Sequence, residues 1–264
     1  MVFVPVYVGG EGIMTGEEKR PAFRKVYNSY IYTYIGDKIK IVLYICIVLE
    51  FFKYQGGMTM TENEIKVFFE KDCSEVAPEL IGKILTYGEK HLRITETEAY
   101  GDNDPFCYGV RYGKTVKNSV SFCKGGKVFI YADMLMFTTG KECGKPQNVL
   151  IRQAECLDDP SADCSKPNKL LKYLEPSKEK WKKLNGERIG EELLIENGDK
   201  LEPKPNTDTR VGIDGNGTII DDYIRNNFFF WSSLSDKEKE DYRTIVKETV
   251  KIYLEKEWRF TKQK

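Results

Sequence analysis

Ile94-Thr-Glu-Thr-Glu-Ala-Tyr100 is the stretch from which the fold of this 264-residue chain is most directly predicted. Its alternation and Thr-rich composition predict a β-strand with Glu96 and Glu98 on the same face as Ile94. Glutamate is uncommon in strands, so two carboxylates on one side indicate either a solvated edge strand or side chains that point into a cleft. The strand ends at Tyr100 before a turn of Gly, Asp, Asn and Pro, a position where functional groups are often found.

The composition sets broad limits on the kind of protein. Forty-one basic and 41 acidic residues give a net charge of zero, so nucleic-acid binding would have to depend on local charge. Seven cysteines form no C-x-x-C pair, and the chain has a single histidine, His91, which argues against a structural zinc site. We therefore expect no metal and no cofactor, and reduced thiols in an intracellular protein of the cytoplasm or nucleoid.

Residues 1–59 differ in character from the rest of the chain. The apolar run at 39–49 is too short to span a bilayer, and no small-residue cleavage site follows it. Gln55-Gly-Gly57 can be encoded by a sequence that contains a bacterial ribosome-binding site ahead of Met60. We therefore predict that 1–59 is a non-native or disordered upstream extension and that one domain covers 60–264; a peptide from 24–53 in the natural protein would contradict this.

Positive charge is concentrated between Arg111 and Arg152, a segment that contains eight basic and two acidic residues. Such a patch is what phosphate binding requires. Within it, 127–131 is a clear strand, and the break in alternation after it predicts a turn whose tip exposes Met134 and Leu135. Apolar residues at a tip between lysines can wedge into a DNA base step, although the same loop could also fold back onto the core.

The remaining pattern predicts an α+β fold with a central antiparallel β-sheet, a roll or open barrel, flanked by helices and carrying a protruding β-hairpin. Further local predictions are a capping box at 61–64, a short helix that begins at Pro78, a hairpin across 83–100, a strand at 192–195, a hairpin-type turn at 215–217, a core strand at 227–231 and an amphipathic helix after Ser235.

Five motifs in this order resemble the 3-methyladenine, or alkyladenine, DNA glycosylases. They are Glu96-Thr-Glu-Ala-Tyr100, Asp104-Pro-Phe-Cys-Tyr108, Gly113-Lys-Thr-Val-Lys-Asn118, Phe122-Cys-Lys-Gly-Gly-Lys-Val-Phe-Ile-Tyr131 and Val149-Leu-Ile-Arg-Gln-Ala-Glu155. The resemblance covers about 76–230. It implies that Glu98 is the general base that activates a water, with Arg152 beside it, and that Tyr100 and Tyr131 stack on a base rotated out of the duplex.

The chain also departs from the family pattern. Tyr108 stands where members usually have a histidine against the flipped base, and Met134-Leu135 replaces a Tyr-Gly pair at the hairpin tip. Lys141 or a neighbour replaces an asparagine expected to line the base pocket. Lys114 and Lys117 fit phosphate contacts, so DNA binding is expected despite these changes.

The resemblance implies a monofunctional DNA glycosylase of base-excision repair that acts, as a monomer and away from membranes, on double-stranded DNA with a damaged purine. The expected bases are alkylated or deaminated purines of the 3-methyladenine, hypoxanthine and ethenoadenine class. Two alternatives stay open: a silent relative that binds DNA or a nucleotide-like ligand without turnover, and a hydrolase of free nucleosides.

Overall fold

A computed structural model of the chain describes residues 33–35, 38–40, 59–198 and 204–263. The chain divides into two compact units, residues 1–55 and 56–264. In the first unit, strand β1 (Thr33–Ile35) pairs antiparallel with β2 (Lys38–Lys40). The apolar run predicted at 39–49 lies outside the described residues from 41 onward, and the assignment of 1–59 as a non-native extension stays a prediction.

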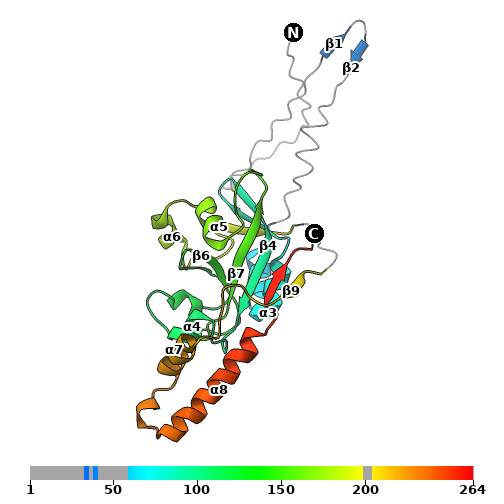
Figure 1. Cartoon of the computed structure of the whole chain (residues 1–264). Coiled ribbons are helices and arrows are strands. Elements are labelled where there is room, and N and C mark those ends of the chain that lie inside the picture. The colour runs from blue at the N-terminus through cyan, green and yellow to red at the C-terminus, as the bar shows by residue number, and fades with distance from the viewer. Residues whose placement is uncertain (1–32, 36–37, 41–58, 199–203, 264) are drawn as a thin grey trace, which may run out of the picture. The chain divides into compact units, whose positions relative to one another are not determined.

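The second unit is built on an antiparallel sheet, and eight strands of the described residues belong to it. The strand order is β5-β6-β7-β4-β10-β9, while β3 pairs with β4 and with β8. Figure 1 shows β4 and β7 side by side at its centre. The bounds are Ile84–Tyr87 (β3), Lys90–Tyr100 (β4), Val128–Tyr131 (β5), Met134–Thr138 (β6), Asn148–Cys156 (β7), Leu193–Glu196 (β8), Asn206–Asp208 (β9) and Arg259–Thr261 (β10).

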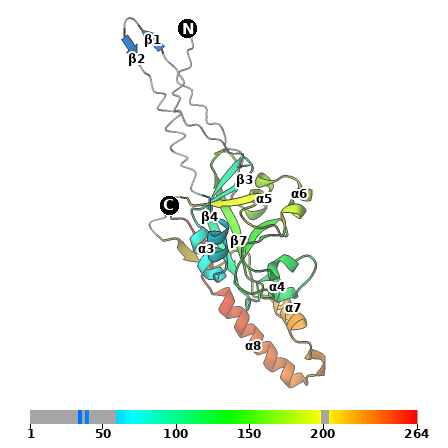
Figure 2. The same ribbon diagram turned by 180° about the vertical axis from the view of Figure 1, so that it is seen from behind.

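Helices cover this sheet and one of its ends, which confirms the predicted α+β class. Figure 2 shows α3 packed over β4 and β7, and Figure 1 shows α4, α7 and α8 gathered beyond the end of β4. The bounds are Glu62–Phe69 (α2), Cys73–Leu80 (α3), Tyr108–Tyr112 (α4), Pro167–Leu174 (α5), Lys178–Leu184 (α6), Gly217–Asn227 (α7) and Asp236–Leu254 (α8), with 3₁₀ turns at Ser119–Phe122 and Trp231–Ser233.

The helix-start signals were mostly correct. Thr61 and Ser235 each cap a helix and form the full capping box, as predicted. Pro78, in contrast, lies inside α3 instead of starting it, because Asp72 provides the earlier N-cap. The predicted turn at 215–217 is also wrong: the Asn216 side chain accepts from the Ile219 N–H and begins α7.

A β-bulge in β4 corrects the predicted strand faces. The pairing of β4 with β7 shifts register on both sides of Glu96. Ile94 is fully buried in the same core cluster as Ala99, while the Thr97 hydroxyl donates to the Ala77 carbonyl of α3 at 2.8 Å. An extra residue in a strand reverses the facing of everything beyond it. Ile94 therefore faces the core, and Glu96 and Glu98 share the opposite face without it.

The β5–β6 hairpin is present, but its tip is not where the sequence predicted. Ala132 and Asp133 form the two-residue turn and both have positive φ, +50° and +59°. Met134 is the first residue of β6 and is half-buried, while Leu135 is fully buried in the core. The prediction that Leu135 is exposed at the tip, and so available to DNA, is wrong.

One further segment was assigned wrongly and one was correct. Residues 227–231, expected to be a core strand, form the end of α7, a turn and the start of the 3₁₀ turn at Trp231–Ser233, and Phe229 is 92% exposed. The strand expected at 192–195 is present as β8. Within the described part of the chain, none of the helices has both the length and the apolar character needed to cross a membrane.

Candidate functional site

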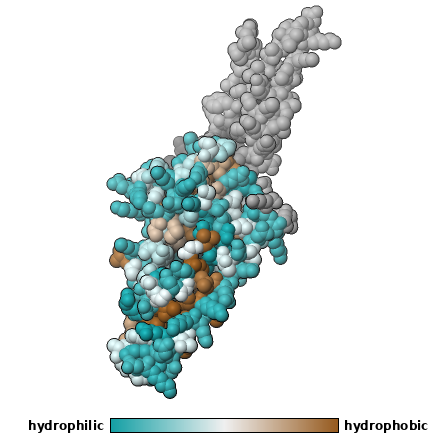
Figure 3. Space-filling view, viewed as in Figure 1, coloured by the Kyte–Doolittle hydropathy of each residue, from teal (hydrophilic) through white to brown (hydrophobic). Residues whose placement is uncertain are grey.

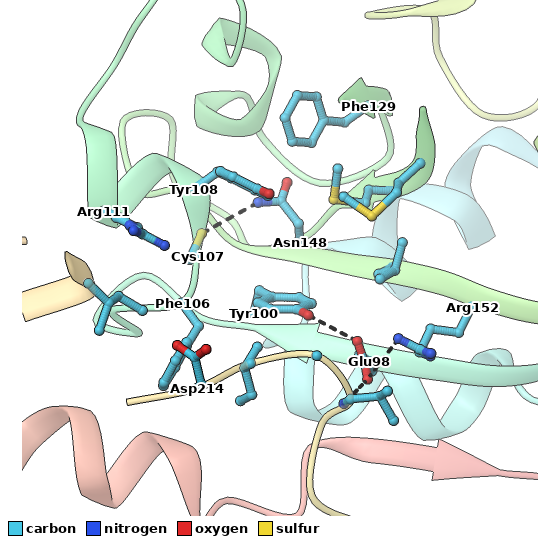
Figure 4. A pocket seen from close by; sticks show the side chains of 17 residues that line it. Glu98, Tyr100, Phe106, Cys107, Tyr108, Arg111, Phe129, Asn148, Arg152 and Asp214 are labelled. Atoms are coloured by element: carbon cyan, nitrogen blue, oxygen red, sulfur yellow. Dashed lines mark hydrogen bonds and ion pairs between the residues drawn. The ribbon is translucent and has the colours of Figure 1, made fainter. Parts of the chain in front are cut away.

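A cavity of about 220 Å³ lies on the face of the sheet toward which Glu98 points, opposite α3. Figure 3 shows apolar side chains gathered on this face of the molecule, and Figure 4 shows the cavity at close range. Strands β4, β6 and β7 form one side of it, and α4, α7 and the loop at 211–214 form the other. Its lining residues are Glu98, Tyr100, Phe106, Cys107, Tyr108, Arg111, Phe129, Met134, Met136, Asn148, Leu150, Arg152, Val211, Gly212, Ile213, Asp214 and Ile219.

Glu98 lies at the base of this cavity with its side chain fully buried. One carboxylate oxygen accepts the Val211 backbone N–H at 2.7 Å, and the other accepts the Tyr100 hydroxyl at 2.9 Å. Arg152 Nη1 lies 3.5 Å from the first oxygen, so the two residues do meet. Burial raises the pKa of Glu98 above its ordinary value, and these three groups oppose that rise.

The net effect on the pKa of Glu98 is a rise. A neighbouring arginine alone would hold the carboxyl below its usual pKa, whereas burial outweighs that attraction here. A carboxylate with a raised pKa is a stronger base when ionised, which suits proton transfer close to neutral pH.

Arg152 is itself held by a second carboxylate, Glu96, which sequence analysis placed on the same face but gave no role. Glu96 Oε1 lies 3.0 Å from Arg152 Nε and 2.7 Å from Arg259 Nε. Arg259 continues the chain to Asp208 at 3.2 Å. These alternating charges join β7, β4, β10 and β9, and they fix the guanidinium that faces Glu98.

A buried ion pair supports the other side of Tyr100. The side chains of Arg210 and Asp104 are fully buried and bonded to each other. The Arg210 guanidinium also donates to the Ala99 carbonyl at 3.1 Å and lies 4.7 Å from the centre of the Tyr100 ring. Arg210 therefore fixes both the ring and the start of the loop that carries Val211.

The three predicted aromatic residues are only partly brought together. Tyr100 and Tyr108 line the cavity, whereas Tyr131 does not. The Tyr131 ring instead contacts Tyr108, with centroids 4.5 Å apart and planes tilted by 50°. A purine can stack between Tyr108 and Tyr131 only if the two rings separate.

The remaining predicted residues either line the cavity, are exposed at the surface or belong to the core. Met134 lines the cavity, and Lys114 and Lys117 are exposed on the loop after α4. Leu135 belongs to the core, as described above. Lys141 is exposed in the loop before β7 and does not line the cavity, so its predicted place in the base pocket is wrong.

Several lining residues were missed because their positions depend on pairing between strands. Phe129, Met136 and Leu150 share one apolar cluster, and the registers of β5–β6 and β6–β7 place Met136 opposite both others. The alternation of apolar residues within each strand was the signal that could have indicated these lining residues. Alternation alone does not show which strand faces lie next to each other in the sheet. Among the described residues, no cluster of three or more His, Cys, Asp or Glu side chains could hold a metal ion.

Comparison with known proteins decides the family. Residues 67–231 match the family described as methylpurine-DNA glycosylase (MPG), which is more than half of the chain. The chain belongs to the methylpurine-DNA glycosylase family. The resemblance inferred from the five motifs is thereby confirmed.

The individual proteins that this chain resembles have names that agree with membership of the methylpurine-DNA glycosylase family. It is 37% identical over 113 residues to the "Putative 3-methyladenine DNA glycosylase" of Rickettsia felis, which is 40% of this chain and 63% of that protein. It is 30% identical over 216 residues to the Rickettsia bellii protein of the same name, 73% of this chain and 89% of the relative. A match to the "DNA-3-methyladenine glycosylase" of Arabidopsis thaliana is 39% identical over 82 residues, 30% of this chain and 32% of that protein.

Proposed function

We propose that this member of the methylpurine-DNA glycosylase family is a monofunctional DNA glycosylase of base-excision repair. It hydrolyses the N-glycosidic bond of an alkylated or deaminated purine that has been rotated out of double-stranded DNA. The observation that carries the proposal is the buried Glu98 carboxylate, held by Arg152, Val211 and Tyr100 at the base of a 220 Å³ cavity.

Each group has a role in the proposed reaction. Glu98 takes a proton from a water as the water oxygen bonds to the sugar carbon, and the electron pair of the glycosidic bond leaves with the base. Arg152 and the Val211 N–H keep the carboxylate ionised and oriented despite its burial. Among the residues that the structure describes, no lysine lines the cavity, so the reaction is written without a Schiff base.

Base and DNA contacts come from neighbouring elements. Tyr100 and Tyr108 stack on the base, and Tyr131 joins them once it separates from Tyr108. Met134, next to the tip of the β5–β6 hairpin, contacts the duplex from which the base has left. Lys114 and Lys117 contact phosphates. We propose an intracellular monomer that needs no cofactor.

One observation favours a second candidate, a silent relative that binds DNA without turnover. The closed contact between Tyr108 and Tyr131 leaves no room for a purine between those rings. If the rings do not separate, the chain could hold damaged DNA without placing the base against Glu98.

Base release separates the two candidates. Single-turnover release of 3-methyladenine or hypoxanthine from a duplex is measured for the full chain, for Glu98→Gln and for Glu142→Gln, a control at an exposed residue that pairs with Lys145. We expect release by the full chain and the control, and a loss of about 100-fold or more with Glu98→Gln. Lesion-specific binding without release by any of the three proteins would instead establish the silent relative.

A further inference from the structure

One polar side chain that lines the cavity, Asn148, has no role in the proposed chemistry. It begins β7 on the cavity face, lies opposite Tyr100 of β4, and is only 3% exposed. Its amide nitrogen donates to Ser121 Oγ at 2.7 Å and faces Cys107 Sγ at 3.8 Å. Its carbonyl oxygen, Oδ1, has no hydrogen-bond partner among the described residues.

Cys107 supports this orientation of the amide. Burial raises the pKa of the Cys107 thiol to about 12, so the sulfur keeps its proton at neutral pH. That proton is directed to the Pro146 carbonyl at 3.5 Å, which leaves the sulfur to act as an acceptor toward Asn148. A carbonyl in the same place would meet no donor at Cys107. In the structure the NH₂ group faces Cys107 and Ser121, and Oδ1 is left buried without a hydrogen-bond partner among the described residues.

An unpaired oxygen at this depth is unusual in a folded protein, because a buried acceptor normally has a partner. The same cavity is lined by Phe129, Met136 and Leu150, which form one apolar cluster and offer no side-chain donor. A ligand that brings an N–H to Asn148 Oδ1 satisfies the oxygen. A ligand without a donor leaves it buried and unpaired.

We propose that Asn148 Oδ1 is a specificity determinant that selects damaged purines carrying an N–H on their pairing edge. The inference rests on the proposed glycosylase function. Hypoxanthine has N1–H and 3-methyladenine has an exocyclic amino group, so each offers a donor. In ethenoadenine the bridge occupies both nitrogens of that edge and leaves none. This chain therefore discriminates against ethenoadenine.

The test compares two neutral bases in otherwise identical duplexes. Single-turnover release of hypoxanthine and of ethenoadenine is measured for the full chain, for Asn148→Leu and for Asn148→Ala, a second variant in case the larger side chain disturbs folding. The control is Met136→Leu, which alters the same cavity without touching an acceptor. We expect the full chain and the control to favour hypoxanthine by about tenfold or more, and both Asn148 variants to lose most of that preference.

Equal release of the two bases by the full chain, or a preference that survives in both Asn148 variants, would overturn the inference while leaving the glycosylase function intact. Release of neither base would count against the function instead. Selection is then judged from equilibrium binding of the full chain and the Asn148 variants to the two lesion duplexes and an undamaged one. A hypoxanthine preference lost in the Asn148 variants supports the role of Asn148, and equal affinities overturn it.

Discussion

The carboxylate of Glu98 is subject to two opposing influences. Removal from water raises its pKa, while hydrogen bonds from Val211 and Tyr100 and the positive charge of Arg152 lower it, with burial the larger effect. The Tyr100 hydroxyl is the contributor that can be removed most cleanly, because its ring is held independently by Arg210.

Tyr100→Phe keeps the ring and removes the hydroxyl that donates to Glu98. The pKa of Glu98 should rise further, since one group that stabilises the charged form is gone. We expect base release to slow by roughly threefold to tenfold at acidic pH and to recover at higher pH, where Glu98 is ionised in both proteins. A pH–rate profile of the variant measures this. Equal slowing at every pH would mean that the hydroxyl acts in some other way.

Glu98 also links stability to pH. Its pKa is raised in the folded state, so the folded protein binds this proton more tightly than the unfolded chain does. The associated stability is fully present below the unfolded pKa and is lost as pH rises through the folded pKa. We therefore expect the free energy of unfolding of Glu98→Gln, relative to the parent, to increase with pH from about 4.5 upward and then level off. Denaturant titrations from pH 4 to 8 measure it, and a constant difference would contradict the burial argument.

At the scale of elements, the β5–β6 hairpin places Met134 and Leu135 on opposite faces of the sheet, although both were predicted to be exposed at the hairpin tip. Alternation in β6 turns Met134 toward the cavity and Leu135 into the core. Leu135→Ala should cost about 2–5 kcal/mol in the free energy of unfolding because it leaves a cavity. Met134→Ala should leave stability nearly unchanged and weaken binding to lesion duplexes. Thermal unfolding and DNA titration of both variants check this. A loss of stability in Met134→Ala together with weaker DNA binding in Leu135→Ala would contradict the burial of Leu135.

Sequence predicted the elements better than the boundaries between them. The hairpin strands, the capping boxes and the strand with two glutamates follow from local chemistry, and the structure contains all of them. The bulge at Glu96 could not be predicted, because it is defined only by the partner strand. The turn after β5 was predicted, but its tip was placed at Met134-Leu135 instead of Ala132-Asp133, because alanine does not favour the positive φ that the pairing of β5 with β6 imposes.

The site shows the same limit. Glu98 and Arg152 could be named from motifs that match the family. Glu96, Val211 and Arg210 act through contacts between residues far apart in the chain, and sequence order carries no distance. Aromatic content likewise predicted a core strand at Phe229, which turns out to be 92% exposed.

At the scale of the molecule, a chain with zero net charge is proposed to bind a polyanion through one local patch. Lys114 and Lys117 are both exposed on the loop after α4. Replacing either with alanine should weaken DNA binding whatever the sequence, and should reduce the slope of log affinity against log salt by about one. Lys237→Ala, an exposed change on α8, is the control. An unchanged slope in both loop variants would show that Lys114 and Lys117 do not contact phosphates.

The most direct test of the account is the pH dependence of 3-methyladenine release under single-turnover conditions. This base is a cationic leaving group, so only ionisation of the general base should limit the rate at low pH. We predict a rate that rises about tenfold per pH unit and levels off at a pKa above the ordinary carboxyl value of 4.5, with the bend moved to higher pH by Arg152→Gln. A rate independent of pH, or a bend that Arg152→Gln does not move, would contradict the assignment of Glu98 as the base.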